Sequence, residues 1–247
     1  MGRRRAPDVM RFFVEQGVLL VGALLELDED ETHHADVRRG REGETVELLD
    51  GKGSVATAIL ERNGKRWSAR VTELRNLPEP ATLVVALGAG DRDRFLSVVQ
   101  QCGELGITRI VPVETERSRQ VESRLRGAGV EKGRRRAREA CKQSGNPWLP
   151  VLDDVMPLVE LGITGSGVRW FFGDPAGAPL APLREQEPVG WVIGPEGGFT
   201  PAEEAWLRER LDATGVWFGP HILRFETATA AAAVLTLQQR ERARLTR

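Results

Sequence analysis

The strongest constraint on the fold is an apolar run that ends in a glycine-rich turn. Residues 189–193 contain no charged side chain, as in a strand buried on both faces of a sheet, and Gly194-Pro-Glu-Gly-Gly198 follows directly. Thr200, Pro201 and Glu203 then have the spacing of an N-cap, a first helical residue and a capping box. This strand–turn–helix unit indicates an α/β fold whose backbone amides can approach a ligand closely. A plain tight turn is the alternative.

The remainder of the chain after residue 80 repeats this alternation of apolar runs and amphipathic segments. The pattern predicts strands at residues 82–87, 107–113, 170–172 and 189–193, and helices at 94–105, 133–144, 201–212 and 227–240. Strands that alternate with helices form a largely parallel sheet, with binding sites at the carboxyl ends of the strands.

The chain before residue 78 has a different sequence pattern, which is typical of short strands joined by turns. Residues 45–49 and 55–60 are strand-like, and a turn at residues 50–53 separates them. Asn63-Gly64 predicts a tight hairpin, and apolar residues alternate with polar ones over residues 66–72. Two prolines, Pro78 and Pro80, favour an extended linker after this small barrel or compact sheet.

Length and composition exclude several classes of protein. The chain has 247 residues, 40% of them hydrophobic, so it can bury a proper core as one large or two ordinary domains. Cys102 and Cys141 cannot build a disulfide framework, which favours a reducing, cytoplasmic setting. The uncharged stretches are too short to span a membrane. Residues 1–9 are basic, lack a following apolar region, and are interpreted as an N-terminal extension outside the fold.

Basic residues concentrate in one stretch although the formal net charge is only -1. Between Arg117 and Lys142 there are ten basic and three acidic residues, a local excess of seven positive charges. Such a patch on a neutral protein indicates a polyanionic partner, and nucleic acid fits. A general preference for arginine over lysine is the alternative.

A second motif occupies residues 218–228, with the sequence Phe218-Gly-Pro-His-Ile-Leu-Arg-Phe-Glu-Thr-Ala228. An alanine-rich segment follows that is apolar on nearly all sides, as in a buried helix. Arg224 and Glu226 lie at the entrance to this helix, where they either meet a ligand or form a salt bridge.

Other candidate sites fail on spacing. Gly88-Ala-Gly-Asp-Arg-Asp93 follows a strand, but Asp93 occupies the position where a dinucleotide-binding turn needs a small residue. His33 and His34 have no cysteine or carboxylate at a metal-binding spacing, so no metal is expected and they are interpreted as part of the barrel or an RNA-facing edge. No Ser/His/Asp arrangement is present.

These motifs together resemble a known enzyme family. The order Glu104-Leu-Gly106, Glu116-Arg-Ser118, Ala140-Cys-Lys-Gln-Ser144, Gly194-Pro-Glu-Gly-Gly198 and Ile222-Leu-Arg-Phe-Glu-Thr-Ala228 is similar to that of RsmE-type 16S ribosomal RNA uracil-N3 methyltransferases of the SPOUT superfamily. His33, Arg39 and residues 46–51 also resemble the small β domain of that family. The likeness extends over nearly everything from Met10 to Gln239.

The resemblance implies a PUA-like, RNA-binding β-barrel at residues 10–77 and a SPOUT-type α/β methyltransferase domain at residues 81–247, with a C-terminal trefoil knot. It further implies a homodimer that binds S-adenosyl-L-methionine in the knot and acts on 16S ribosomal RNA of the small subunit. These four features, namely the PUA-like barrel, the knot, the dimer and the cofactor, follow from the resemblance alone. Periodicity and spacing do not indicate any of them.

The resemblance also assigns residues to roles. It places the cofactor against Phe172, Gly173, Ile193, Gly194, Glu196, Gly197, Gly198, Phe218, Gly219, Ile222 and Leu223. Arg224 is expected to donate to a uracil oxygen, and Glu226 to act as a base or to orient Arg224, with the two assignments interchangeable. His221 is a competing base. The basic stretch, and not the resemblance, is the reason to expect RNA contacts from Arg117, Arg134, Arg135, Arg138 and Lys142. Further RNA contacts are expected from Arg38, Arg39 and Arg94, which would compensate for the loss of an arginine at Asn146.

Three departures from the family pattern leave alternatives open. Residues 36–39 are shorter than the usual basic-apolar stretch, Ala89 replaces a common basic residue, and Asn146 replaces an arginine. A ribosome- or RNA-binding protein of the same fold without turnover is therefore the alternative function. A nucleotide-phosphate binder using Gly194–Gly198 is a weaker one, because no Lys-Ser/Thr follows the loop.

Overall fold

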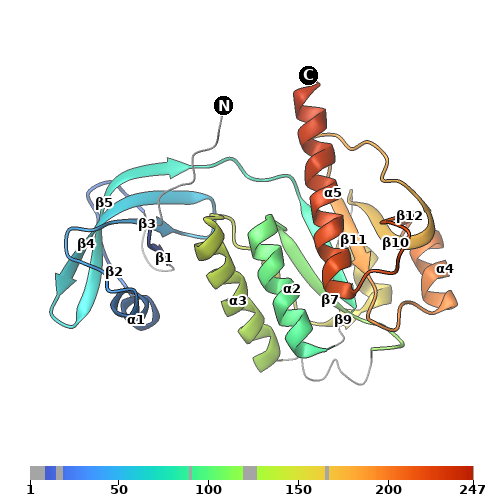
Figure 1. Cartoon of the computed structure of the whole chain (residues 1–247), viewed down its shortest axis with the longest axis horizontal. Helices are drawn as coiled ribbons and strands as arrows, with labels where there is room; N and C mark the ends of the chain where they lie inside the picture. The colour runs from blue at the N-terminus through green and yellow to red at the C-terminus, as the bar shows by residue number, and fades with distance from the viewer. Residues whose placement is uncertain (1–8, 15–18, 89–90, 119–126, 165–166, 247) are drawn as a thin grey trace. The chain divides into compact units, whose positions relative to one another are not determined.

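The computed structural model describes residues 9–14, 19–88, 91–118, 127–164 and 167–246. The chain forms two compact units (Figure 1). Unit 1 comprises Met1–Glu79 and Cys141–Leu149, and unit 2 comprises Pro80–Ala140 and Pro150–Arg247. The N-terminal extension expected at residues 1–9 lies outside the described residues, apart from Val9.

Unit 1 contains a five-stranded sheet with one helix. Its strands are β1 (Arg11–Phe13), β2 (Leu24–Glu26), β3 (Thr45–Leu49), β4 (Ser54–Asn63) and β5 (Arg66–Asn76), in the order β1-β3-β4-β5-β2. The hairpin expected at Asn63-Gly64 is confirmed, since Asn63 pairs with Arg66 across it. Helix α1 (Glu29–Val37) was not expected from the sequence; the side chain of Asp28 caps it by accepting a hydrogen bond from the Glu31 amide.

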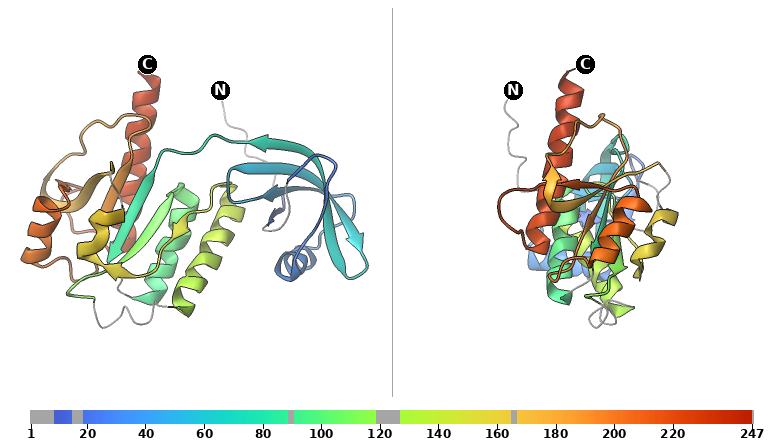
Figure 2. Two further views of the ribbon diagram at one scale, coloured as in Figure 1. Left: turned by 180° about the vertical axis from the view of Figure 1, so that it is seen from behind. Right: turned by 90° about the vertical axis from the view of Figure 1, so that its right-hand side faces the viewer.

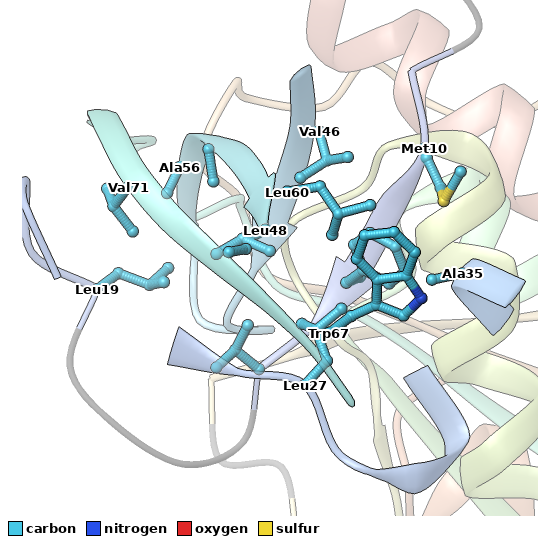
Figure 3. Packing of buried hydrophobic residues seen from close by; sticks show 14 residues of the cluster. Met10, Leu19, Leu27, Ala35, Val46, Leu48, Ala56, Leu60, Trp67 and Val71 are labelled. Atoms are coloured by element: carbon cyan, nitrogen blue, oxygen red, sulfur yellow. The ribbon is translucent and has the colours of Figure 1, made fainter. Parts of the chain in front are cut away.

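The core of unit 1 is apolar and continuous. Leu48, Leu60 and Trp67 of the sheet belong to one cluster with Ala35 of α1, and Figure 3 shows Trp67 beside Ala35. Alternate residues of β4 and β5 point into this core, which explains the period-two pattern of the sequence. The indole N–H of Trp67 donates to Asp36, so its polar edge is satisfied at the margin of the core.

A buried ion pair joins α1 to the segment Cys141–Leu149. The ammonium of Lys142 donates to both carboxylate oxygens of Glu31 at 2.9 and 3.1 Å, and the two side chains are only 7% and 5% exposed. The Phe13 amide also donates to Glu31. Residues 141–149 therefore group with unit 1, whereas the predicted methyltransferase domain ran unbroken over residues 81–247.

Unit 2 is built on a parallel sheet. Its strands are β6 (Leu83–Gly88), β7 (Arg109–Glu114), β8 (Val151–Leu152), β9 (Met156–Pro157), β10 (Arg169–Ala178), β11 (Val189–Ile193) and β12 (Thr214–Val216). The order is β12-β10-β11-β6-β7-β8, with β9 also paired to β7. The predicted parallel α/β sheet is confirmed. The short strands β8, β9 and β12 lack the apolar runs by which the others were recognised.

Helices cover both faces of this sheet. They are α2 (Arg92–Leu105), α3 (Ala128–Ser144), the 3₁₀ helix η2 (Leu158–Thr164), α4 (Pro201–Glu209) and α5 (Phe225–Leu245). Figure 2 shows α2 and α5 on one face, and α4 and η2 on the other. Leu158, Leu161, Leu207 and Leu211 pack against Phe172 and Val192 on the second face. The trefoil knot stays a prediction.

Helix α5 is anchored to the sheet at two points. Thr236 accepts a hydrogen bond of 2.8 Å from the buried indole of Trp191 in β11. One turn later, the buried Arg240 donates to the carbonyl oxygens of Ala81, Thr82 and Glu187. Burial lowers the pKa of Arg240, which the nearby Glu187 carboxylate counteracts. Among the described residues, none of the helices is both long and apolar enough to cross a membrane.

The Glu31–Lys142 pair predicts a specific stability defect. Lys142→Met should lower the free energy of unfolding of unit 1 by about 3–5 kcal/mol, because it leaves a buried carboxylate without its ammonium. The double variant Glu31→Gln/Lys142→Met, which buries no charge, should recover most of that loss. Urea unfolding measures both, with the exposed Lys65→Met as the control. Equal destabilisation by the single and double variants would contradict this account.

Candidate functional site

The carboxyl ends of β6, β10, β11 and β12 meet at one edge of the unit 2 sheet, as parallel pairing requires. A pocket of about 500 Å³ opens there, a size suited to a nucleoside-sized ligand. Its walls come from β10, the end of β11 and the turn after it, the first turn of α2, α4, and the segment that leads into α5. The lining residues are Arg94, Gly173, Asp174, Pro175, Ile193, Gly194, Pro195, Glu196, Gly198, Phe199, Glu204, Phe218, Gly219, His221, Ile222, Leu223, Arg224, Phe225 and Ala228.

The turn after β11 has the geometry that its sequence predicts. Gly198 has a φ of +67°, and its amide donates to the Pro195 carbonyl at 2.8 Å, which closes the turn. Thr200 and Glu203 form the expected capping box at the start of α4, with Pro201 as its first residue. The helix start is therefore rigid, and it holds the glycine turn at the pocket wall.

Close packing around two glycines holds the strand ends and the pocket-lining residues Pro195 and Phe218 in place. A Cβ added to Gly88 would lie 2.6 Å from Cδ and 2.7 Å from the backbone nitrogen of Pro195. A Cβ on Gly173 would lie 2.8 Å from the ring of Phe218. These glycines allow neighbouring strand ends to approach one another, and the cradle they form fits a flat, largely apolar group such as a nucleoside base.

The wall before α5 is apolar and exposed. Phe218 packs on Trp191 with ring centroids 5.3 Å apart, which fixes the start of this segment. Leu223 is half-buried, whereas Ile222 is 93% exposed. An isoleucine this exposed in the lining of a pocket is available for apolar contact with a bound molecule.

Charged side chains surround the mouth. Arg94 donates to Glu196 at 3.3 Å, and Arg117 donates to the carbonyl oxygen of Gly197. The sequence assigned both arginines to RNA, but the structure places them against the glycine turn. Asp174, half-buried, pairs with Arg208 at 2.5 Å.

Arg224 and Glu226 lie at the start of α5 as expected. Arg224 is the N-cap residue, is exposed and lines the pocket. Glu226 is in the first turn and does not line the pocket, but its Oε2 is buried and has no hydrogen-bond partner among the described residues. No salt bridge joins these two side chains in the described part of the chain, so that alternative is not observed. His221 is exposed and lines the pocket.

Nine of the eleven residues assigned to the cofactor by resemblance line this one pocket; Phe172 and Gly197 do not. Phe172 is 2% exposed and packs in the core beneath α4, because alternate residues of β10 face opposite sides of the sheet. Asp174, Pro175, Phe199 and Glu204 also line the pocket, although none of them was expected there from the sequence. The position of Asp174 directly after Gly173 at a strand end was a usable signal.

The residues assigned to RNA are distributed more widely. Arg38 and Arg39 are exposed at the end of α1, and Arg39 has a φ of +57°. On α3, Arg135 is exposed, whereas Arg134 bonds to Glu131 and to the Leu152 carbonyl oxygen and Arg138 is half-buried.

Lys142 needs correction as an RNA contact, since its ammonium is buried against Glu31. Asn146 accepts a hydrogen bond from the Trp148 amide and shapes a turn of unit 1. Ala89 and the basic residues between 119 and 126 lie outside the described residues. Over the described ranges, no three His, Cys, Asp or Glu side chains group so as to hold a metal ion.

Comparison with known proteins agrees with this architecture. A family model described as an RNA methyltransferase domain matches residues 75–237, and one described as an RNA methyltransferase PUA domain matches residues 27–76. Proteins named ribosomal RNA small subunit methyltransferase E are similar along most of their length. The Mycobacterium tuberculosis protein is 31% identical over 85% of each chain, and the Aquifex aeolicus protein is 32% identical over 85% of this chain and 92% of its own.

Solved structures extend the comparison to three dimensions. The ribosomal RNA small subunit methyltransferase E of Neisseria gonorrhoeae, bound to S-adenosyl methionine, has a TM-score of 0.83 and 27% identity over 94% of this chain and 98% of its own. A Legionella pneumophila methyltransferase structure in complex with the same cofactor has a TM-score of 0.78 and 27% identity, with the same coverage.

The close packing at the strand ends predicts which glycines are replaceable. Gly88→Ala should lower the free energy of unfolding by about 1–3 kcal/mol, because its methyl group would overlap the backbone of Pro195. Gly197→Ala is the matched control: its methyl group would meet only the flexible side chain of Arg117, at 3.3 Å, so a change within about 0.5 kcal/mol is expected. Thermal or urea unfolding of both variants measures this difference. Similar values for the two would argue against tight packing at Gly88.

Proposed function

Because this chain belongs to the ribosomal RNA small subunit methyltransferase E family, we propose that it methylates N3 of a uridine in 16S ribosomal RNA. S-adenosyl-L-methionine is the methyl donor. The observation that carries the proposal is the pocket at the carboxyl edge of the sheet, which is lined both by the glycine turn after β11 and by the segment before α5.

The residues of the pocket fit this cofactor. Gly173, Gly194 and Gly198 allow close contact with a nucleoside, while Phe218 and Leu223 offer apolar surface for an adenine ring. When bound, the cofactor supplies a methyl group already activated on a sulfonium. The protein therefore has mainly to align the two reactants, exclude water and accept the proton that leaves the uracil.

The proton on uracil N3 must leave before the nitrogen can attack. Arg224 projects from the N-cap of α5 into the pocket, and no ion pair is formed by it in the described part of the chain. It is suited to stabilise the negative charge that develops on a uracil oxygen. The buried, unpartnered Oε2 of Glu226 is the acceptor for a proton or for a donor group of Arg224. His221 at the pocket mouth is the competing base.

The target uridine must be unpaired, since N3 lies on its Watson–Crick edge. Phosphate contacts come from the exposed basic side chains Arg38, Arg39 and Arg135, with Arg134 and Arg138 beside them on α3. Lys142 is left out because it is buried.

Two further expectations belong to the proposal. Helix α5 exposes Val234, Leu237 and Leu245 at 45%, 39% and 70%, and a second copy of the chain would cover this apolar surface in a homodimer. A cytoplasmic location suits two buried thiols that form no disulfide: burial raises the pKa of Cys141 to about 12 and also raises the pKa of Cys102.

The alternative function is that of a protein of the same fold that binds RNA without methylating it. Nucleoside analysis of 16S ribosomal RNA from a deletion strain separates the two. Loss of 3-methyluridine, restored by the wild-type gene, is the result expected for an enzyme. An unchanged modification would favour the binding protein.

The catalytic assignment predicts large losses of turnover. Arg224→Lys should lower kcat about 100-fold or more, because a point charge cannot reproduce the fixed fork of donors. Glu226→Gln should cost about as much if the carboxylate takes the proton. Methyl transfer to small-subunit particles from radiolabelled cofactor measures both, with cofactor affinity as the control for folding. Near-normal methylation by both variants would discard this scheme.

The basic side chains proposed to contact phosphates predict a steep dependence of RNA binding on salt. Arg135→Gln should weaken binding and reduce the slope of log affinity against log salt by about one phosphate contact. Glu139→Gln, the loss of an exposed acidic side chain on the same helix, should leave that slope unreduced. Filter binding of a 16S ribosomal RNA fragment at several salt concentrations gives the slopes. A flat salt response of the wild type would contradict the proposed phosphate contacts.

A further inference from the structure

An irregular stretch within strand β10 places the carboxylate of Asp174 in the pocket wall. Asp174 belongs to neither of the two sequence motifs that indicated this site. Strand β10 pairs with β12 up to Gly173 and again at Ala178, and the register shifts between them. The residues in between leave the regular pairing, and Asp174 and Pro175 line the pocket. Such irregularities re-aim side chains, and they are frequent beside active sites.

The Asp174 carboxylate is held in one orientation. Its Oδ1 accepts a hydrogen bond of 2.8 Å from the Ala176 amide, and its Oδ2 accepts one of 2.5 Å from Arg208 of α4. The Arg208 guanidinium in turn lies 4.7 Å from the ring centroid of Phe172. The Asp174 side chain is only 14% exposed, compared with 39% for Glu196 in the same pocket.

The surrounding backbone leaves room for this carboxylate. A Cβ added to the buried Gly215 of β12 would lie 2.6 Å from Oδ2 of Asp174. A Cβ on Gly177, at the other end of the loop, would lie 2.7 Å from the backbone of Gly215. Neither glycine has a positive φ, so the close approach of the loop and β12 is what requires them.

Each carboxylate oxygen keeps one lone pair after these two bonds, so two acceptor positions remain. A vicinal diol offers two hydroxyl donors at a matching spacing. We propose that Asp174 binds the ribose hydroxyls of the methyl donor and thereby selects ribonucleosides over deoxyribonucleosides. This inference rests on the proposed function, because it concerns the cofactor of that same pocket.

The ribose is a better partner for Asp174 than the charged groups of the cofactor. Arg208 already compensates the negative charge of Asp174, so the pair attracts a sulfonium or an ammonium weakly. Its free lone pairs still accept hydrogen bonds from neutral hydroxyls.

The first test uses the wild-type chain and needs no variant. Isothermal calorimetry compares S-adenosylhomocysteine with its 2′-deoxy and 3′-deoxy counterparts. Loss of the hydroxyl that donates to Asp174 should weaken binding about 10- to 100-fold. Equal affinity for all three compounds would overturn the assignment of Asp174. Absence of heat with S-adenosylhomocysteine itself would overturn the proposed cofactor as well, so the two failures are distinguishable.

The second test couples the ligand change to the side chain. Asp174→Asn should weaken the binding of S-adenosylhomocysteine about 10- to 100-fold. It should hardly change the affinity for the deoxy compound that lacks the hydroxyl donating to Asp174. Asp212→Asn, the same chemical change at an exposed position, should alter neither affinity. If Asp174→Asn weakened the parent and both deoxy compounds by the same factor, Asp174 would only hold the loop, and the proposal would be wrong.

Discussion

The site depends on parallel pairing of four strands whose carboxyl ends reach the same edge. That pairing brings Gly88, Gly173, Ile193 and Val216 close together, although the sequence spreads them over more than a hundred positions. A Cβ at Gly88 would overlap Pro195 and a Cβ at Gly173 would overlap the ring of Phe218, so the close approach at these strand ends requires glycine. A pocket at this edge of the sheet follows from this arrangement.

The start of α5 is positioned by contacts that the same helix makes about three to four turns later. The hydrogen bond from Trp191 to Thr236 and the three carbonyl oxygens bound by Arg240 hold the helix on the sheet. A helix so anchored presents Arg224 to the pocket from its N-cap and holds Glu226 in its first turn, beside the pocket lining. Chemistry at one end of α5 is therefore supported by structure near the other.

The parts of the site that were predicted correctly are those whose geometry depends only on residues close together in the sequence. The turn after β11 carries its own glycines, N-cap and capping box, so its geometry followed from residues within fifteen positions of one another. Arg224 and Glu226 were recognised for the same reason, as charges at the entrance to an apolar helix. Phe172 was misplaced because its neighbours in sequence do not reveal which face of β10 meets the pocket, and Asp174 was missed because it belongs to no motif.

The sequence by itself determined the two-part organisation, the parallel sheet, the hairpin at Asn63-Gly64 and the turn that leads into α4, because each depends on local propensity and periodicity. Helix α1 was not predicted, because only two of its nine residues are apolar and no amphipathic pattern marks it. The tertiary structure alone decided that Lys142 faces Glu31, 111 residues away, instead of a phosphate, and that Arg208 holds Asp174 at the pocket. Such long-range pairings depend on how distant segments pack, and no local pattern encodes that.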